Sequence, residues 1–402
     1  MAEIMQGNAT DAQVRSRRHA AARSRCRLAL TRWRLAQIGG FLVALGPTDD
    51  PDVVGACAAT MTDHAQQIKV DGISVDIVGT GGDGLVSSAT FLHLELPSLR
   101  CALPALTRAA CLMRQDTFNC STACSFFVAA CGTKVSKHGN RSASGNVGSA
   151  DFLEGLGANI MLDADKVLAT IDGCGFGFLF AQKFHPAMRF VMPARKVRPP
   201  ARLRRLSRQR LSRQRLTALT LRLQQQLGVP TVFNVLGPLT NPCRPTAQLI
   251  GVGKPHLAPL YAKIFASRDS KTMIVHSSEG LDEISIAAPT TAWICEGGKI
   301  REEQVTPADF GLPTHSLDLL QGGTVEERCG WFTQIIDPAL TDDQRGPKVC
   351  AIRDFCIINA AAALWVAGVA ADYKAATAMI QEAIAGGKAK DTVAKYVEIS
   401  KS

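Results

Sequence analysis

A glycine-rich loop is the first segment of the sequence whose residue types suit a chemical role. The apolar run 73–78 is typical of a buried strand, and the loop 79–84 (G-T-G-G-D-G) follows it directly. Glycine tolerates positive φ and lets backbone N–H groups approach an anion closely. Ligands commonly bind beyond the carboxyl end of a parallel strand. The same composition also makes an ordinary tight turn, so alone the loop indicates a phosphate site only weakly.

A second polar segment precedes an apolar helical stretch. Residues 116–122 (D-T-F-N-C-S-T) lead into small and apolar residues through Ala130. Asn, Ser and Thr at the start of a helix are usually caps. The exposed N–H groups and the dipole at a helix N-terminus also suit a phosphate group. Both interpretations remain open from this segment alone.

Two charged segments complete the set. Residues 137–141 (K-H-G-N-R) follow a predicted strand, and this mixture suits a polyanion beside a planar polar ligand. Asp282 and Glu283 follow a strand that ends near His276. Adjacent carboxylates usually form a solvated turn, but Mg²⁺ bound to a pyrophosphate prefers one or two carboxylates. The pair therefore gains meaning only beside the phosphate-type loops.

The elements around these loops alternate between the two kinds of secondary structure. We predict strands at 73–78, 133–136, 159–162, 176–181, 248–252 and 271–276, and helices at 53–61, 121–130, 149–156 and 163–171, with a helical region from 357 onward. Such alternation predicts an α/β fold with a central, mostly parallel sheet.

The composition limits the class of protein. A chain of 402 residues with 46% hydrophobic and 20% charged residues is typical of a globular protein of two or three domains. It has no run of 18 apolar residues and no visible secretory signal, so we expect no membrane-spanning helix. The thirteen cysteines show no C-x-x-C pair or zinc spacing. We therefore expect reduced thiols and a cytoplasmic location.

The basic charge is concentrated in one segment. The net charge is +10, but residues 197–226 contain nine arginines and no Lys, Asp or Glu, and without those arginines the charge would be +1. This segment also repeats L-S-R-Q-R at 206–210 and 211–215, which is low complexity. The charge therefore does not indicate a nucleic-acid-binding face over the whole protein.

Taken together, the motifs resemble the anthranilate phosphoribosyltransferase family. The segments already quoted, beginning with D-I-V-G-T-G-G-D-G, are followed in order by G-S-A-D-F-L-E, G-F-L-F-A-Q-K-F-H-P-A-M-R, V-F-N-V-L-G-P-L-T-N-P and G-L-D-E. The resemblance runs from about Gln37 to about Lys395. It implies transfer of a phosphoribosyl group from 5-phosphoribosyl pyrophosphate (PRPP) to anthranilate, a Mg²⁺ cofactor, a nucleoside-phosphorylase-like fold and a homodimer.

The resemblance also implies roles for individual residues. Those matching pyrophosphate and ribose contacts are Gly79, Gly82, Asp83, Thr117, Asn119, Ser121, Thr122, Lys137, His138, Gly139, Asn140, Arg141 and Ser149. Gly79, Asn140 and Arg195 match anthranilate contacts, and Ser121, Asp282 and Glu283 match Mg²⁺ ligands. No catalytic acid or base is assigned.

The family organisation predicts three parts, with two departures. We expect a disordered Arg/Ala-rich extension at 1–35, the first part of a small helical domain at 36–72 and an α/β domain at 73–402. Segments 85–114 and 197–226 are insertions where the family runs on almost directly. They are either lids or interaction segments, or translated introns of an imperfect gene model. The second interpretation is favoured because each interrupts a motif cleanly, resumes it in frame and has unusual composition.

Other functions remain as alternatives. A nucleoside phosphorylase would share the fold, but its loops differ from K-H-G-N-R-S and it lacks the Asp-Glu pair. A nucleic-acid-binding or scaffold protein could use the Arg-rich segment, although no RNA-binding aromatic motif accompanies it and aromatic residues make up only 6%. A catalytically impaired family member is the third alternative, since both insertions lie beside the predicted site.

Overall fold

The structure is a computed structural model that describes residues 45–46, 48–80, 117–142, 147–188 and 231–402. The chain divides into two compact units, one from 1–66 and 185–236 and the other from 67–184 and 237–402. The predicted extension 1–35, both insertions and three predicted site residues (Gly82, Asp83 and Arg195) lie outside the described residues. The domain boundaries inferred from the sequence stay predictions.

The first unit contains one described helix of more than one turn, α3 (Pro51–Asp63). Asp50 is its N-cap, and its side chain accepts a hydrogen bond from the backbone N–H of Asp52 at 3.1 Å. Pro51 suits the first helical position, where no backbone N–H is required. The helix predicted at 53–61 is therefore confirmed.

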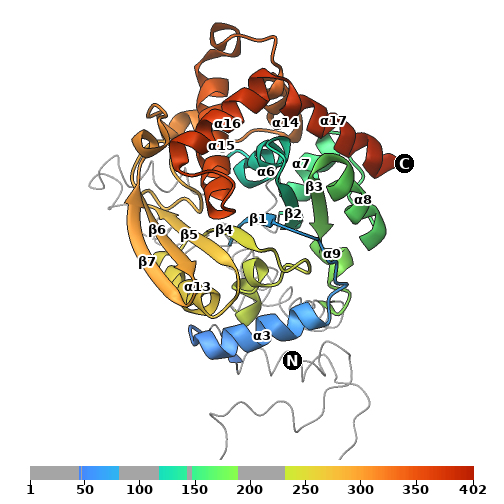
Figure 1. Cartoon of the computed structure of the whole chain (residues 1–402), viewed down its shortest axis with the longest axis vertical. Coiled ribbons are helices and arrows are strands. Elements are labelled where there is room, and N and C mark those ends of the chain that lie inside the picture. Colours follow the sequence, from blue (N-terminus) through green and yellow to red (C-terminus); the bar gives the residue numbers. More distant parts are fainter. Residues whose placement is uncertain (1–44, 47, 81–116, 143–146, 189–230) are drawn as a thin grey trace, which may run out of the picture. The chain divides into compact units, whose positions relative to one another are not determined.

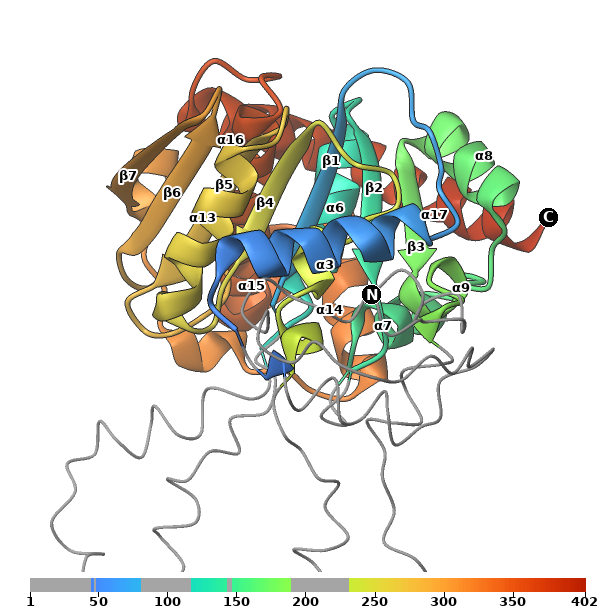
Figure 2. The ribbon, with the colours of Figure 1, turned by 90° about the horizontal axis from the view of Figure 1, so that it is seen from below.

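The second unit is built on a seven-stranded sheet in the order β3-β2-β1-β4-β5-β6-β7 (Figures 1 and 2). The strands are β1 (Ser74–Gly79), β2 (Lys134–Gly139), β3 (Phe176–Phe180), β4 (Ala247–Gly251), β5 (Lys271–Ser277), β6 (Thr290–Glu296) and β7 (Lys299–Val305). The first five pair in parallel, whereas β6 pairs antiparallel with both β5 and β7. The predicted α/β fold with a mostly parallel sheet is confirmed.

Helices cover both faces of this sheet (Figure 2). On one face lie α6 (Cys120–Ala130), α14 (Val325–Ile336), α15 (Asp342–Val366), α16 (Tyr373–Ala385) and α17 (Lys388–Lys401), which share one apolar core with inward residues of β1, β4 and β5 such as Ile77, Leu249 and Val275. The other face carries α8 (Ala164–Cys174) beside β3 and α13 (Ala258–Ala266) beside β5 and β6. Two short helices, α7 (Ser149–Gly155) and α9 (Ala181–Phe184), complete this region.

The strand predicted at 159–162 is wrong. Its alternating pattern is real, because Ile160 and Leu162 are both buried. The backbone nevertheless pairs with side chains and not with a strand: Asn159 N donates to Ser400 Oγ at 3.0 Å, and Met161 N donates to Asn159 Oδ1 at 3.0 Å. A connection that buries every second residue therefore shows the same alternating sequence pattern as a strand.

Among the described residues, α15 has the length and apolar composition that could cross a membrane. However, 83% of its most apolar stretch is buried inside the fold, as expected of a core helix. Its helical geometry is interrupted at Gly346, where φ is 76°, just before Pro347. The rest of α15 packs against α6 and the sheet. The described cysteines are all free thiols.

Candidate active site

The predicted glycine loop begins where the strand order of the sheet reverses. The chain runs outward from β1 to β2 and β3, then returns to place β4 on the other side of β1. Gly79 and Gly251, the last residues of β1 and β4, are paired in register. Ligands of open α/β sheets bind outside the carboxyl ends of strands at such a point. The geometry thus places the start of the loop at the expected binding edge.

Asp282 lies directly over this glycine pair. A Cβ added to Gly79 would come within 2.3 Å of Asp282 Oδ2, and one added to Gly251 within 1.4 Å of the Asp282 carbonyl oxygen. Thr80 fixes the chain just beyond, since its N–H donates to Gly251 O at 2.8 Å and its Oγ1 accepts from Gly253 N at 3.1 Å. Gly79 thus leaves room for the Asp282 carboxylate, and Gly251 leaves room for the Asp282 backbone.

Glu283 adds a second carboxylate with an unusual environment. Its Oε2 is buried and has no hydrogen-bond partner among the described residues. Burial raises the pKa of Glu283 well above its usual range, and the neighbouring carboxylate of Asp282 raises it further. No group of three or more His, Cys, Asp or Glu in the described part of the chain could hold a metal ion. Two carboxylates with one unsatisfied oxygen nevertheless fit Mg²⁺, which takes most of its ligands from water and substrate.

Lys137 brings a buried positive charge to the same edge. Its side chain is only 1% exposed, and its Nζ donates to Ile77 O at 2.6 Å and to Ser121 Oγ at 3.3 Å. Burial lowers the pKa of Lys137, whereas the charge of Asp76 acts in the opposite direction. The ammonium group therefore links β2, β1 and the first turn of α6. It is desolvated and fixed, as a group that stabilises developing negative charge should be.

Asp76 lies on β1 just beyond the residues that pair with β2. In that pairing, Ser74 lies opposite Lys134 and Val75 opposite Val135. Beyond it, Asp76 Oδ1 accepts from the His138 backbone N–H at 3.2 Å and Asp76 Oδ2 accepts from Asn241 Nδ2 at 2.8 Å. Burial raises the pKa of Asp76 to about 6, opposed chiefly by Lys137. Asp76 was not among the predicted site residues.

The N-terminus of α6 supplies the predicted second phosphate element. Asn119 occupies the N-cap position, but its side chain does not cap the helix. Its Oδ1, the atom that could cap, accepts from Arg328 Nη1 at 3.2 Å, and its Nδ2 donates to Val147 O at 2.8 Å. Ser121 lies in the first turn and meets Lys137. Thr122 is buried, and its Oγ1 has no hydrogen-bond partner among the described residues. One of the hydroxyls inferred from the sequence, that of Ser121, thus lies beside the lysine.

The basic loop after β2 is held against α7. Asn140 is exposed, and its Oδ1 accepts from Arg141 N at 2.8 Å and from Gln182 Nε2 at 3.3 Å. The Arg141 guanidinium pairs with Asp151 at 2.7 Å and with Glu154 at 2.6 Å, and these carboxylates raise its pKa. Both predicted ligands therefore lie near the site, but the Arg141 charge is engaged with α7.

The remaining predicted residues of this loop are close packed. A Cβ on Gly139 would come within 2.7 Å of the Phe178 ring and 3.3 Å of Ser149 Cβ, so β2 and the start of α7 touch there. His138 is buried, and Thr117 forms an isolated antiparallel bridge with Gln321. The structure brings these residues to the same edge as Lys137, and their contacts with substrate stay predictions.

Comparisons with known proteins agree with this geometry. Residues 113–197 and 215–390 match a family described as "Glycosyl transferase family, a/b domain". The anthranilate phosphoribosyltransferase of Nocardia farcinica is 34% identical over 362 residues, covering 89% of this chain and 85% of the relative. The chain belongs to the anthranilate phosphoribosyltransferase family.

Solved structures of the family have the same fold. Anthranilate phosphoribosyltransferase from Thermus thermophilus gives a TM-score of 0.69 at 28% identity, covering 100% of this chain and 93% of that one. The Saccharomyces cerevisiae enzyme in complex with PRPP and Mg gives 0.68 at 25% identity, covering 91% and 85%. A variant of the yeast enzyme in complex with 4-fluoroanthranilate gives 0.66 at 25% identity, with the same coverage.

Besides Asp76, two further buried polar side chains of this family member were not predicted from the sequence. Arg328 of α14 is 1% exposed, and its Nη1 donates to Thr117 O at 2.6 Å and to Asn119 Oδ1 at 3.2 Å. Asn359 of α15 is also 1% exposed and bonds the backbone of Ile284, next to Glu283. Arg328 follows two glutamates in α14 and Asn359 stands in an apolar stretch of α15, so no local spacing indicated that either reaches the site.

Proposed function

We propose that this protein transfers the phosphoribosyl group of PRPP to anthranilate, giving N-(5-phosphoribosyl)anthranilate and pyrophosphate, an early step of tryptophan biosynthesis. One observation carries the proposal: the buried Lys137 ammonium, the Ser121 hydroxyl and the Asp282–Glu283 carboxylates lie together at the carboxyl end of the sheet. A cation beside two carboxylates suits a metal-bound pyrophosphate. The relatives solved with PRPP and Mg and with 4-fluoroanthranilate support the choice of substrates.

The leaving group determines what the site must do. Breaking the bond between ribose C1 and pyrophosphate builds negative charge on the pyrophosphate oxygens. Lys137 is positioned by Ile77 O and Ser121 Oγ and would stabilise that charge without rearranging. Asp282, Glu283 and Ser121 would hold Mg²⁺, which when bound neutralises the phosphate oxygens. The N-terminus of α6 would contact phosphate through its N–H groups.

The acceptor needs orientation more than activation. The amine of anthranilate is an aromatic amine that is already neutral at pH 7, so no strong general base is required. Holding that nitrogen against ribose C1 supplies much of the rate. We propose that Asn140 and Gly79 contribute to the acceptor pocket, with Arg195 binding the carboxylate through a two-pronged hydrogen bond. Asn140 is exposed immediately after β2, the strand that carries Lys137, and this exposure supports its part in the proposal.

We also propose that the protein acts as a homodimer in the cytoplasm, by its resemblance to the family. Size-exclusion chromatography with light scattering would measure the oligomeric state directly. A monomer at assay concentrations would contradict the homodimer without affecting the proposed reaction.

The reaction is tested by the loss of anthranilate fluorescence when PRPP and MgCl₂ are added to the purified full chain. Mass spectrometry should identify the phosphoribosylated amine, and omission of either PRPP or MgCl₂ should abolish the change. The same assay on a chain lacking 85–114 and 197–226 tests the insertions. Activity only in the shortened chain identifies the full chain as an impaired family member, and inactivity of both overturns the proposed reaction.

A further inference from the structure

We propose that Asn359 is a positioning residue that holds the Asp282–Glu283 pair in its metal-binding arrangement. This proposal rests on the proposed function, in which that pair is the Mg²⁺ site. Asn359 lies on α15, 75 residues after Ile284, and it makes no predicted contact with substrate. Its role follows from where its amide is directed and from what that amide fixes.

The side-chain amide of Asn359 bonds both backbone groups of Ile284, the N–H and the carbonyl. Asn359 Oδ1 accepts from Ile284 N at 2.9 Å, and Asn359 Nδ2 donates to Ile284 O at 3.1 Å. A third bond runs from Nδ2 to Phe355 O at 2.9 Å, one turn back along α15. The side chain is 1% exposed, so these bonds are shielded from water. Two hydrogen bonds therefore hold the residue after Glu283 against a core helix.

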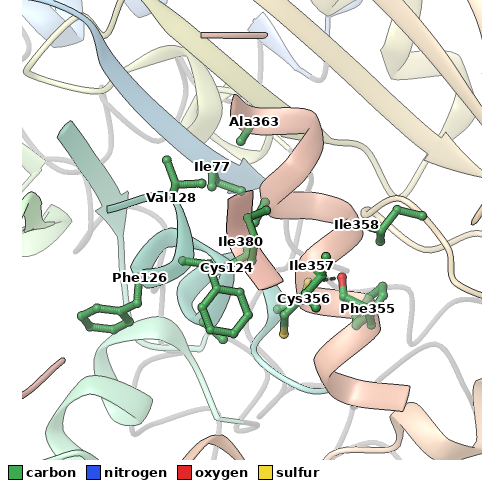
Figure 3. Close-up of a cluster of buried hydrophobic side chains, with 14 of the residues drawn as sticks. Ile77, Cys124, Phe126, Val128, Phe355, Cys356, Ile357, Ile358, Ala363 and Ile380 are labelled. Atoms are coloured by element: carbon green, nitrogen blue, oxygen red, sulfur yellow. Dashed lines mark hydrogen bonds between the residues drawn. The ribbon is translucent and has the colours of Figure 1, made fainter. Parts of the chain in front are cut away.

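The same carbonyl connects this anchor to the phosphate end of the site. Phe355 O also accepts from Cys120 Sγ at 3.4 Å, and Cys120 immediately precedes Ser121. Figure 3 shows this region, where Cys356 of α15 lies close to Cys124 of α6. The helix that carries Ser121 and the segment that carries Glu283 thus share one fixed point on α15.

Such an anchor has a definite electrostatic purpose. Two adjacent carboxylates repel each other when both are ionised, and Glu283 Oε2 is buried without a hydrogen-bond partner among the described residues. Without a bound cation, a free segment would relax by moving one carboxylate into water. The Asn359 bonds oppose this movement at Ile284, while the Gly79–Gly251 pair leaves space for Asp282 on the other side. The protein thereby holds both ligands close before a cation arrives.

The test uses the full chain with three variants. Asn359→Leu removes all three hydrogen bonds at similar side-chain size. Asn359→Asp keeps an acceptor for Ile284 N but replaces the donor Nδ2 with an oxygen that faces Ile284 O and Phe355 O. Ile171→Ala is the control, because Ile171 of α8 is buried in a different hydrophobic cluster, together with Val167 and Leu179. Binding of Mn²⁺ in the presence of pyrophosphate is followed by the loss of the free-ion electron paramagnetic resonance signal, and folding is checked by thermal melting.

We expect both Asn359 variants to bind Mn²⁺ about tenfold more weakly, as loss of groups that support metal ligands typically does. Ile171→Ala should melt earlier yet bind Mn²⁺ as the wild type does. In the anthranilate assay, the MgCl₂ concentration for half-maximal rate should rise by the same factor while the KM for anthranilate stays constant. If Asn359→Leu fails to fold, Asn359→Asp decides the question.

Unchanged Mn²⁺ affinity in a folded Asn359 variant overturns the inference, as does equal weakening in Ile171→Ala or a lack of Mn²⁺ binding by the wild type. Failure of the proposed function would look different. In that case the wild type would leave anthranilate unconsumed, while the difference in Mn²⁺ affinity between the wild type and the Asn359 variants would persist.

Discussion

The Asp282 carboxylate rests on the backbone of Gly79, so close that a single added methyl group at Gly79 would come within 2.3 Å of Asp282 Oδ2. This contact joins the first residue of the glycine loop to one of the two acidic residues, although they lie about 200 positions apart in the sequence. It explains why a glycine is needed at this strand end even without an unusual φ. The loop and the carboxylate pair therefore form one site.

Replacing Gly79 with Ala should lower kcat/KM by about 100-fold, because displacing a substrate-positioning group by about 1 Å has an effect of that size. Gly253→Ala is a matched control in the neighbouring loop, since an added Cβ there meets no atom within 4 Å and the N–H that bonds Thr80 is retained. Steady-state anthranilate assays of both variants give the comparison. Equal activities in the two variants would show that the position of Asp282 does not matter.

Replacing Arg328 with Met should raise the KM for PRPP about tenfold, because the Thr117–Asn119 turn loses its buried anchor. The loss of charged hydrogen bonds should also reduce stability by about 2–3 kcal/mol. Arg345→Met provides a matched control, since Arg345 likewise bonds two carbonyl groups, Gln334 O and Asp337 O, at the end of α14. It should lower stability comparably and leave the KM for PRPP unchanged; a similar rise in both would reduce Arg328 to a purely structural residue.

The sequence allowed the parallel sheet to be predicted, because strand and helix periods alternate clearly around the loops. The antiparallel hairpin β6–β7 was missed although it carried a signal: Gly297 and Gly298, both with positive φ, follow a run rich in β-forming residues. The β7 run itself is mostly charged and exposed, so it gave no strand signal of its own. Asp282 and Glu283 could be placed in the site only through family resemblance. Arg328, Asn359 and Asp76 could not be found, since burial of a single polar residue depends on contacts that span the whole chain.

Asp76 makes a pH dependence testable. Its folded pKa of about 6 lies above the ordinary value of 3.8, so the folded state binds its proton more tightly than the unfolded state does. The resulting stability is fully present below pH 3.8 and is lost as pH rises through 6, by about 3 kcal/mol at most. In urea unfolding between pH 4 and 7, the free energy of unfolding of the wild type should fall relative to that of Asp76→Asn as pH rises. A constant difference would mean that Lys137 offsets the burial of Asp76 completely.

The last prediction concerns the carboxylate pair itself. Replacing both Asp282 and Glu283 by Ala should sharply reduce turnover at limiting MgCl₂, because the ligands for the cation are lost and Lys137 alone faces the pyrophosphate. The free protein should be at least as stable as the wild type, since the buried Glu283 Oε2 without a hydrogen-bond partner among the described residues is removed together with the adjacent carboxylate. Rates over a MgCl₂ series together with thermal melting separate these effects. Full turnover at limiting MgCl₂ in a folded double variant would rule out a metal-binding role for Asp282 and Glu283.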